Sequence, residues 1–135
     1  MTFLTTTVAV TASQIEHLTT VPVTLIAAPG LGSVIWVLNY TINYLAATPY
    51  TLNDTESLNI QTNGYDWDDV PIPTVGFMDQ TTNQVFTQLG EPQIGAPATL
   101  INEPLVLNNA GGGSNFAGGT STLLVTVTYL VLTGQ

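Results

Sequence analysis

Short stretches of β-branched, aromatic and leucine residues alternate along the chain with clusters of glycine, proline, asparagine and aspartate. Thr, Val, Ile, Tyr and Leu suit the pleated, half-buried surface of a sheet, and the clusters between them are typical of turns. The pattern therefore predicts strands along most of the chain. They are Phe3–Val10, Pro22–Ala28, Ser33–Tyr44, Tyr50–Leu52, Leu58–Gln61, Val75–Met78, Gln84–Leu89, Pro104–Asn108 and Thr120–Leu132.

Three local features refine this reading. Ser13 followed three residues later by Glu16 is a capping-box pattern, which predicts a short helix over Ser13–Leu18. The turn Pro29–Gly32 joins two apolar strands, so these strands form the strongest predicted hairpin of the chain. The segment Gln84–Leu89 is also compatible with a helical turn, and that alternative stays open.

The last predicted strand is apolar on both faces. This is expected of a strand in the centre of a packed sandwich, or of one whose outer face meets another subunit. One face carries Leu123, Val125, Val127, Tyr129 and Val131, and the other carries Leu124, Thr126, Thr128, Leu130 and Leu132.

Some eight or nine short strands separated by turns predict an all-β fold, an antiparallel β-sandwich that is jelly-roll-like and has one short N-terminal helix. The length of 135 residues fits a single domain over residues 1–135. The segment Thr62–Pro97 contains several prolines and predicts a long, irregular excursion, and Asn108–Gly119 predicts a glycine-rich loop.

Charge narrows the possible partners. Only 7% of the residues are charged; nine are acidic and none is lysine or arginine, which gives a formal net charge of −9. Nucleic acids and anionic membrane surfaces are bound mainly through basic side chains, so we expect neither as a partner. A surface with so few charges favours a subunit that is covered by copies of itself or by a scaffold. The absence of cysteine favours assembly in a reducing cytoplasm.

The acidic cluster Asp66, Asp68 and Asp69 is the best metal candidate, because calcium binds several carboxylate oxygens. The EF-hand register fails, since Pro71 and Phe77 stand where glycine and glutamate are needed. A solvated acidic loop is the simpler interpretation, and no cofactor is predicted.

The sequence offers little for catalysis. His17 is the only histidine, no nucleophile-elbow pattern surrounds any serine, and a solvent-facing or half-packed position in the short helix is expected for His17. The chain is therefore predicted not to be an enzyme. Trp36 lies in an apolar strand and is expected in the core, whereas Trp67, among aspartates, is expected to be exposed and available to stack on a sugar.

Several motifs resemble small virion structural proteins of tailed bacteriophages. They are a short helix ending in Leu18, a Pro-Val-x-Leu-Ile strand from Pro22, the Ala-Pro-Gly-x-Gly turn at 28–32, Thr48-Pro49-Tyr50, and Gly118-Gly119-Thr120 leading into the final strand. The resemblance covers about half of the chain. It implies a jelly-roll-like head decoration, cement or fibre subunit, often trimeric, with no catalytic residues.

The leading hypothesis is a capsid decoration or cement subunit, assembled in the host cytoplasm. It would stabilise the phage head through contacts with its own copies and with the major capsid protein or another virion protein. The alternative is a carbohydrate-binding fibre or tail-tip module. The expected contact elements are Phe3–Val10, Asn63–Met78 and the loop near Phe116, and the expected interface residues are Phe3, Leu4, Val8, Trp67, Phe77 and Phe116.

Overall fold

The computed structural model describes residues 2–68, 70–90, 99–110 and 114–135. Within these ranges the chain forms eight strands and one short helix, which confirms the predicted all-β class. No helix of the described ranges is long and apolar enough to cross a membrane. The elements are β1 (Leu4–Val10), α1 (Ala12–Glu16), β2 (Val23–Ile26), β3 (Ser33–Leu45), β4 (Asn59–Thr62), β5 (Tyr65–Asp66), β6 (Gln84–Leu89), β7 (Leu105–Asn108) and β8 (Thr122–Thr133).

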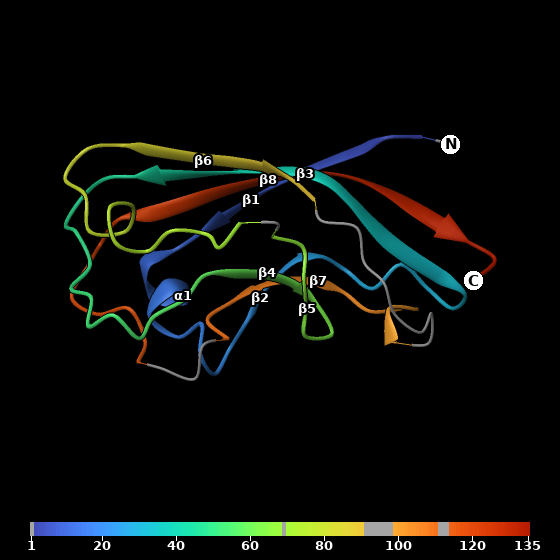
Figure 1. Cartoon of the computed structure of the whole chain (residues 1–135), viewed down its shortest axis with the longest axis horizontal. Helices are drawn as coiled ribbons and strands as arrows, with labels where there is room; N and C mark the ends of the chain where they lie inside the picture. Colours follow the sequence, from blue (N-terminus) through green and yellow to red (C-terminus); the bar gives the residue numbers. More distant parts are fainter. Residues whose placement is uncertain (1, 69, 91–98, 111–113) are drawn as a thin grey trace.

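The strands form two antiparallel sheets of four, which lie as two layers (Figure 1). Sheet A has the order β1-β8-β3-β6 and sheet B the order β2-β7-β4-β5. The first strand pairs with the last, the second with the seventh, the third with the sixth and the fourth with the fifth. The chain thus behaves as one long antiparallel ribbon rolled into a sandwich, which is the arrangement of a jelly roll.

The predicted hairpin between the second and third strands is wrong. β2 pairs with β7 in sheet B, whereas β3 pairs with β8 and β6 in sheet A. The turn containing Gly30 and Gly32 therefore carries the chain from one layer to the other. Both glycines have positive φ, +108° and +70°. A tight turn needs this conformation whether it joins paired strands or crosses between sheets, so the turn signal alone does not distinguish the two.

The core lies between the two sheets and is organised by the β3–β8 pair. Tyr40 and Ile42 of β3 are fully buried opposite Val127 and Val125 of β8. A bulge in β3 at Leu38 inserts one extra residue there, so the register on its far side continues with Val37 opposite Tyr129. β8 lies between β1 and β3, as expected for a strand that is apolar on both faces.

Several local predictions need correction. Thr11, and not Ser13, caps α1: the backbone N–H of Gln14 donates to the Thr11 hydroxyl at 3.2 Å, and the Thr11 N–H donates to the Gln14 side chain at 2.9 Å. Tyr50–Leu52 forms no strand beyond a single bridge from Thr51 to Ala117, and Val75–Met78 is a turn. Gln84–Leu89 is a strand, so its helical alternative is wrong.

Gly90 fits closely against the bulge of β3. Its N–H donates to the carbonyl of Leu38 at 2.8 Å, and a Cβ at this position would clash with the carbonyl oxygen of Val37. The clash involves backbone, which cannot turn away as a flexible side chain would. The end of β6 is therefore held against β3 by a contact that only glycine permits.

We expect Gly90→Ala to lower the free energy of unfolding by about 1–3 kcal/mol, because the added methyl group overpacks the bulge. Urea denaturation followed by tryptophan fluorescence measures this change. The adjacent, exposed Leu89→Ala is the control and should change stability by less than about 0.5 kcal/mol. Equal stability of Gly90→Ala and the unsubstituted chain would contradict the close approach at Val37.

Candidate contact surface

A row of four threonines crosses the outer face of sheet A. Thr7 of β1 lies opposite Thr126 of β8, Thr126 opposite Thr41 of β3, and Thr41 opposite Thr87 of β6. The hydroxyl oxygens of Thr7 and Thr126 are 3.1 Å apart, and the Thr41 hydroxyl donates to that of Thr87 at 3.0 Å. We call these residues the threonine row. Hydroxyls that bond one another across strands hold their side chains flat against the sheet.

The residues on either side of the threonine row are also uncharged. Parallel to the threonine row, the neighbouring residues form further rows, each with one residue from β1, β8, β3 and β6. None of these four strands contains a charged residue. The outer face of sheet A consists of the threonine row together with Ala9, Leu124, Asn43 and Val85 on one side and Thr5, Thr128, Asn39 and Leu89 on the other.

Exposed apolar side chains concentrate at the β6 side of this face. Val85 is 65% exposed and Leu89 74% exposed, and both alternate with Thr87 along the edge strand β6. Leu45, at the end of β3, is also exposed. A single exposed apolar residue is ordinary, but apolar residues on a flat, charge-free sheet provide a surface that loses little hydration when a protein covers it.

The negative charge lies elsewhere. The acidic residues within the described ranges all belong to α1, β5 or the loops, and none belongs to a strand of sheet A. Within the described ranges the four strands of sheet A therefore carry no charge, and in sheet B only β5 carries a charged residue, Asp66. The described acidic residues are Glu16, Asp54, Glu56, Asp66, Asp68, Asp79 and Glu103.

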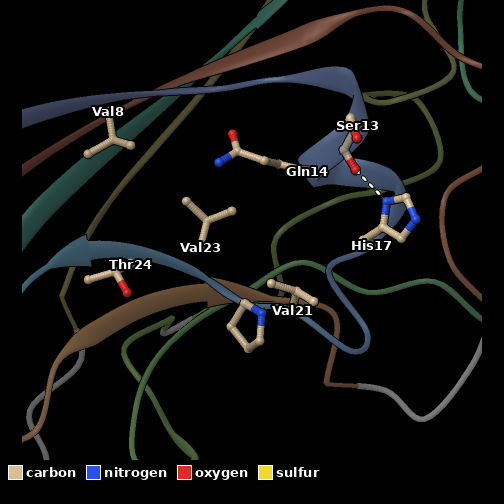
Figure 2. Close-up of a pocket in the computed structure, with 8 residues that line it drawn as sticks. Val8, Ser13, Gln14, His17, Val21, Val23 and Thr24 are labelled. Carbon is tan, nitrogen blue, oxygen red and sulfur yellow. Dashed lines mark hydrogen bonds between the residues drawn. The ribbon is translucent and has the colours of Figure 1, made fainter.

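A pocket of about 460 Å³ opens where β1, α1 and β2 meet. Figure 2 shows Gln14 extending from α1 into the space between Val8 of β1 and Val23 of β2, with His17 at the far end of the helix. The His17 Nδ1 lies 2.7 Å from the carbonyl oxygen of Ser13. His17 is exposed, in agreement with the solvent-facing position predicted for it. The pocket lies between edge strands of the two sheets.

The acidic cluster is only partly described. The Asp66 carboxylate accepts a hydrogen bond from the Gln61 side-chain amide at 2.7 Å, so β4 orients it. Asp68 is half-buried and forms a bridge with Gly90, while Asp69 lies outside the described residues. Among the residues that are described, no three histidine, aspartate or glutamate side chains are grouped so as to hold a metal ion. The calcium site stays a prediction.

Three of the six predicted interface residues lie at the N-terminal edge of sheet A. Phe3 is 69% exposed and Leu4 38% exposed, and Val8 is half-buried at the wall of the pocket. Their placement keeps the predicted contact role of this segment open.

The other three predicted interface residues are buried, and their predicted contact role is wrong. Trp67, Phe77 and Phe116 are 0%, 3% and 1% exposed. Each comes from a loop or turn that folds back and inserts an aromatic ring into the core. Trp67 packs edge-on against Trp36, Phe77 lies against Tyr44, and Phe116 packs edge-on against Tyr50, with ring centroids 5.8–5.9 Å apart. The expectation that Trp67 is exposed for sugar stacking is wrong for the same reason.

Sequence reasoning missed the exposed face of β6 and the pocket. The sequence does contain the signal for the exposed face of β6, since Val85, Thr87 and Leu89 alternate with residues that face the inside of the sandwich. The pocket depends on β1 and β2 belonging to different sheets, and the sequence pattern carries no such information.

Two buried tyrosines have raised pKa values. Burial raises the pKa of Tyr40, the negative charge of Asp68 raises it further, and the contact with the Gln88 amide partly opposes them. Burial also raises the pKa of Tyr50, with a smaller contribution from Glu16. The Tyr50 hydroxyl donates to the Ser121 carbonyl at 2.5 Å. Burial thus favours the protonated form of both hydroxyls.

No family model and no curated protein matches the chain. Among solved structures, it is similar to a chain of the cyanophage Pam1 capsid asymmetric unit, with a TM-score of 0.50 and 19% sequence identity. The similarity covers 95% of this chain and 82% of that chain. At this identity the two chains share a fold, the β-sandwich described above.

We expect the chain to lose stability as the pH rises above about 10. The unfolded tyrosines release their protons near that value, whereas the folded state keeps Tyr40 and Tyr50 protonated, so the unfolded state binds fewer protons and is favoured. Urea unfolding between about pH 8 and pH 11 measures the slope. Tyr50→Phe should be less stable at pH 8 but should show a shallower decline, and an unchanged slope in this variant would contradict the assignment.

Trp67→Ala should lower the free energy of unfolding by about 3–5 kcal/mol, because it leaves a large cavity beside Trp36. Trp67→Phe should cost less, since it keeps most of the packing and loses the hydrogen bond from Trp67 Nε1 to the Thr62 hydroxyl at 2.9 Å. Chemical denaturation, followed by far-ultraviolet circular dichroism, measures both. A stability change below about 0.5 kcal/mol for Trp67→Ala would indicate an exposed residue and revive the sugar-stacking hypothesis.

Proposed function

We propose that this chain is a non-enzymatic structural subunit of a bacteriophage virion, and more specifically a decoration subunit that binds the outside of the head. The observation that carries the proposal is the charge-free outer face of sheet A on a jelly-roll sandwich. The similarity in fold to a chain of the cyanophage Pam1 capsid asymmetric unit supports a place in a virion. The same similarity extends over nearly the whole of this chain.

The physical role of such a subunit is to cover a protein surface. The outer face of sheet A consists of hydroxyl, amide and apolar groups from four strands, so a partner can cover it without burying an unpaired charge. Its threonine row already satisfies part of its hydrogen-bonding capacity within the sheet. Docking therefore requires little rearrangement of side chains.

The area of the outer face of sheet A limits the affinity of a single contact. Four strands about 4.8 Å apart and some seven residues of about 3.3 Å each cover an area on the order of 440 Å². A stable protein–protein contact buries about 800 Å² on each partner. One copy of this face alone would bind a shell weakly. Tight attachment to a repetitive particle would then require copies that are linked to one another, because linkage makes each further contact intramolecular.

The charge balance fits an outer position. Nine acidic residues and no basic ones make contact with the packaged genome unfavourable, because each phosphate would face a like charge. A protein on the outside of a head meets other proteins and solvent, where acidic loops aid solubility.

Thr87→Glu tests the contact face. It places a charge at the exposed end of the threonine row, so we expect it to reduce the amount of chain bound to purified heads by about tenfold or more at a fixed concentration. Val75→Glu adds the same charge on an exposed turn outside sheet A and should bind like the unsubstituted chain. Co-sedimentation with heads that lack the chain, followed by quantitative gels, measures both.

Two results would overturn the proposal. One is the absence of the chain from purified virions in a quantitative mass-spectrometric inventory. The other is normal head binding by a folded Thr87→Glu variant, which would exclude the outer face of sheet A as the contact.

A further inference from the structure

Each sheet has two edge strands, and three of the four edges are blunted. β2 has only four residues, follows Pro22, and shifts register between Thr24 and Ile26. β5 has two residues, one of them Asp66. At β6, the Gln88 side chain bonds the backbone N–H and C=O of Val70 at 3.0 Å, and Asp68 bridges Gly90, so a neighbouring segment covers part of the edge. Shortness, proline, bulges, charge and covering segments are the features by which proteins protect sheet edges.

β1 has none of these features. Its seven residues contain no charge, proline or glycine, and its register with β8 is continuous from Leu4 to Val10. Among the residues that the structure describes, no backbone hydrogen bond outside the β1–β8 ladder involves this strand. β1 therefore presents a long, regular row of backbone donors and acceptors along its open side, and such a row pairs readily with another strand.

Charge selects the partner that this edge fits. The chain has nine acidic residues and no basic ones, so two copies repel each other over most of their surfaces. β1 is the edge of the sheet whose strands carry no charge, so two copies that pair there bring no charged residue of β1 against another. The edge is thus the place where a second copy can approach most easily.

We propose that β1 pairs antiparallel with β1 of a second copy around a two-fold axis at Thr6, which joins the two A sheets into one continuous sheet. The inference goes beyond the proposed function, because it concerns the isolated protein and holds whether or not the chain binds a phage head.

The sequence of β1 is complementary to itself in this register. Residues directly opposite each other in an antiparallel pair point to the same side of the sheet. On the outer side, Phe3 would lie opposite the small Ala9, and Thr5 opposite Thr7. On the inner side, Leu4 would lie opposite Val8, and Thr6 opposite its own copy. Each pair thus matches a large residue with a small one, an apolar residue with another, or a hydroxyl with a hydroxyl.

The pocket beside β1 supports the inner-side pairing. Val8 lines it, and Leu4 is 38% exposed although it stands in a strand of the sandwich. With Leu4 of one copy opposite Val8 of the other, the leucine side chain would cover the mouth of the partner's pocket, and the two-fold axis would repeat this contact. Two exposed leucines and two half-open pockets would be covered at once.

A pair related by a two-fold axis is closed, because each copy uses its single free β1 edge. The geometry therefore predicts a dimer in place of the trimer that the resemblance to virion proteins implied. It also doubles the charge-free face, since both outer faces lie on the same side of the joined sheet. A dimer would bind a repetitive surface through two faces instead of one.

The first test uses a disulfide, which the chain permits because it contains no cysteine. In Thr6→Cys the two new thiols would lie directly opposite each other, at the separation where cross-strand disulfides form. We expect most of the oxidised variant to migrate as a covalent dimer on a non-reducing gel. The control is Val85→Cys, at an exposed position on β6, the other edge of the same sheet, and we expect it to remain mainly monomeric on that gel.

The second test measures mass by light scattering. The unsubstituted chain should have twice the 14.3 kDa of one copy. Leu4→Glu should reduce the mass to that of one copy, since each glutamate would bring a charge to the mouth of the partner's pocket. Val85→Glu should remain a dimer. Circular dichroism establishes that each variant is folded. A monomeric or trimeric unsubstituted chain, or equal cross-linking of Thr6→Cys and Val85→Cys, would overturn the proposal.

The outcomes separate this inference from the proposed function. A dimer that does not bind heads would contradict the decoration role and leave the β1 pairing intact. Head binding by a monomeric chain would contradict the β1 pairing and leave the decoration role intact.

Discussion

The pairing of β3 with β8 is the interaction on which the rest of this structure depends. These two long strands pair from Ser33 opposite Thr133 to Leu45 opposite Thr122, with one register shift at the Leu38 bulge. They connect parts of the chain that are 77 to 100 residues apart, and β1 and β6 add to their two sides to complete sheet A. Their inner side chains form the centre of the hydrophobic core, and their outer side chains form the middle of the charge-free face. One ladder thus determines both the stability of the sandwich and the surface that it presents.

Aromatic side chains from loops and turns complete the core. Trp67, Phe77 and Phe116 come from loops or turns, and each packs against another aromatic residue. The partners are Trp36 and Tyr44 of β3, and Tyr50, which follows β3 in the sequence. Large aromatic rings are effective for this purpose, because one side chain fills the volume that a short loop cannot fill with backbone. These loop segments are therefore part of the core, and the charge-free face described above lies on regular strands.

The sequence predicts the strands well and their partners poorly. Alternation and β-branched residues identify β1, β3, β6, β7 and β8, because the pleat itself imposes that pattern. They do not reveal that the turn at Gly30 crosses between layers, since a hairpin and a crossing need the same turn residues. The loop aromatics show the same limit. Trp67 stands among aspartates, which predicts exposure, yet the neighbouring strand β4 offers Thr62 as a hydrogen-bond partner and Trp36 provides a packing surface. Phe3 and Leu4 are exposed, which is compatible with the contact role predicted for them, and that role stays a prediction.

The distribution of charge connects the fold to assembly. In an isolated soluble protein, charges are usually spread over all faces, and a sheet edge is protected by a lysine, a proline or a covering loop. Among the described residues, the acidic side chains lie in the loops, the helix and β5, and β1 is both uncharged and regular. The net negative charge opposes the association of two copies, and this repulsion is weakest at an edge strand that carries no charge. The β1 pairing proposed above would use this edge, while the net charge opposes association in other orientations. A decoration subunit of the proposed kind would thereby combine solubility before assembly with one permitted contact between copies.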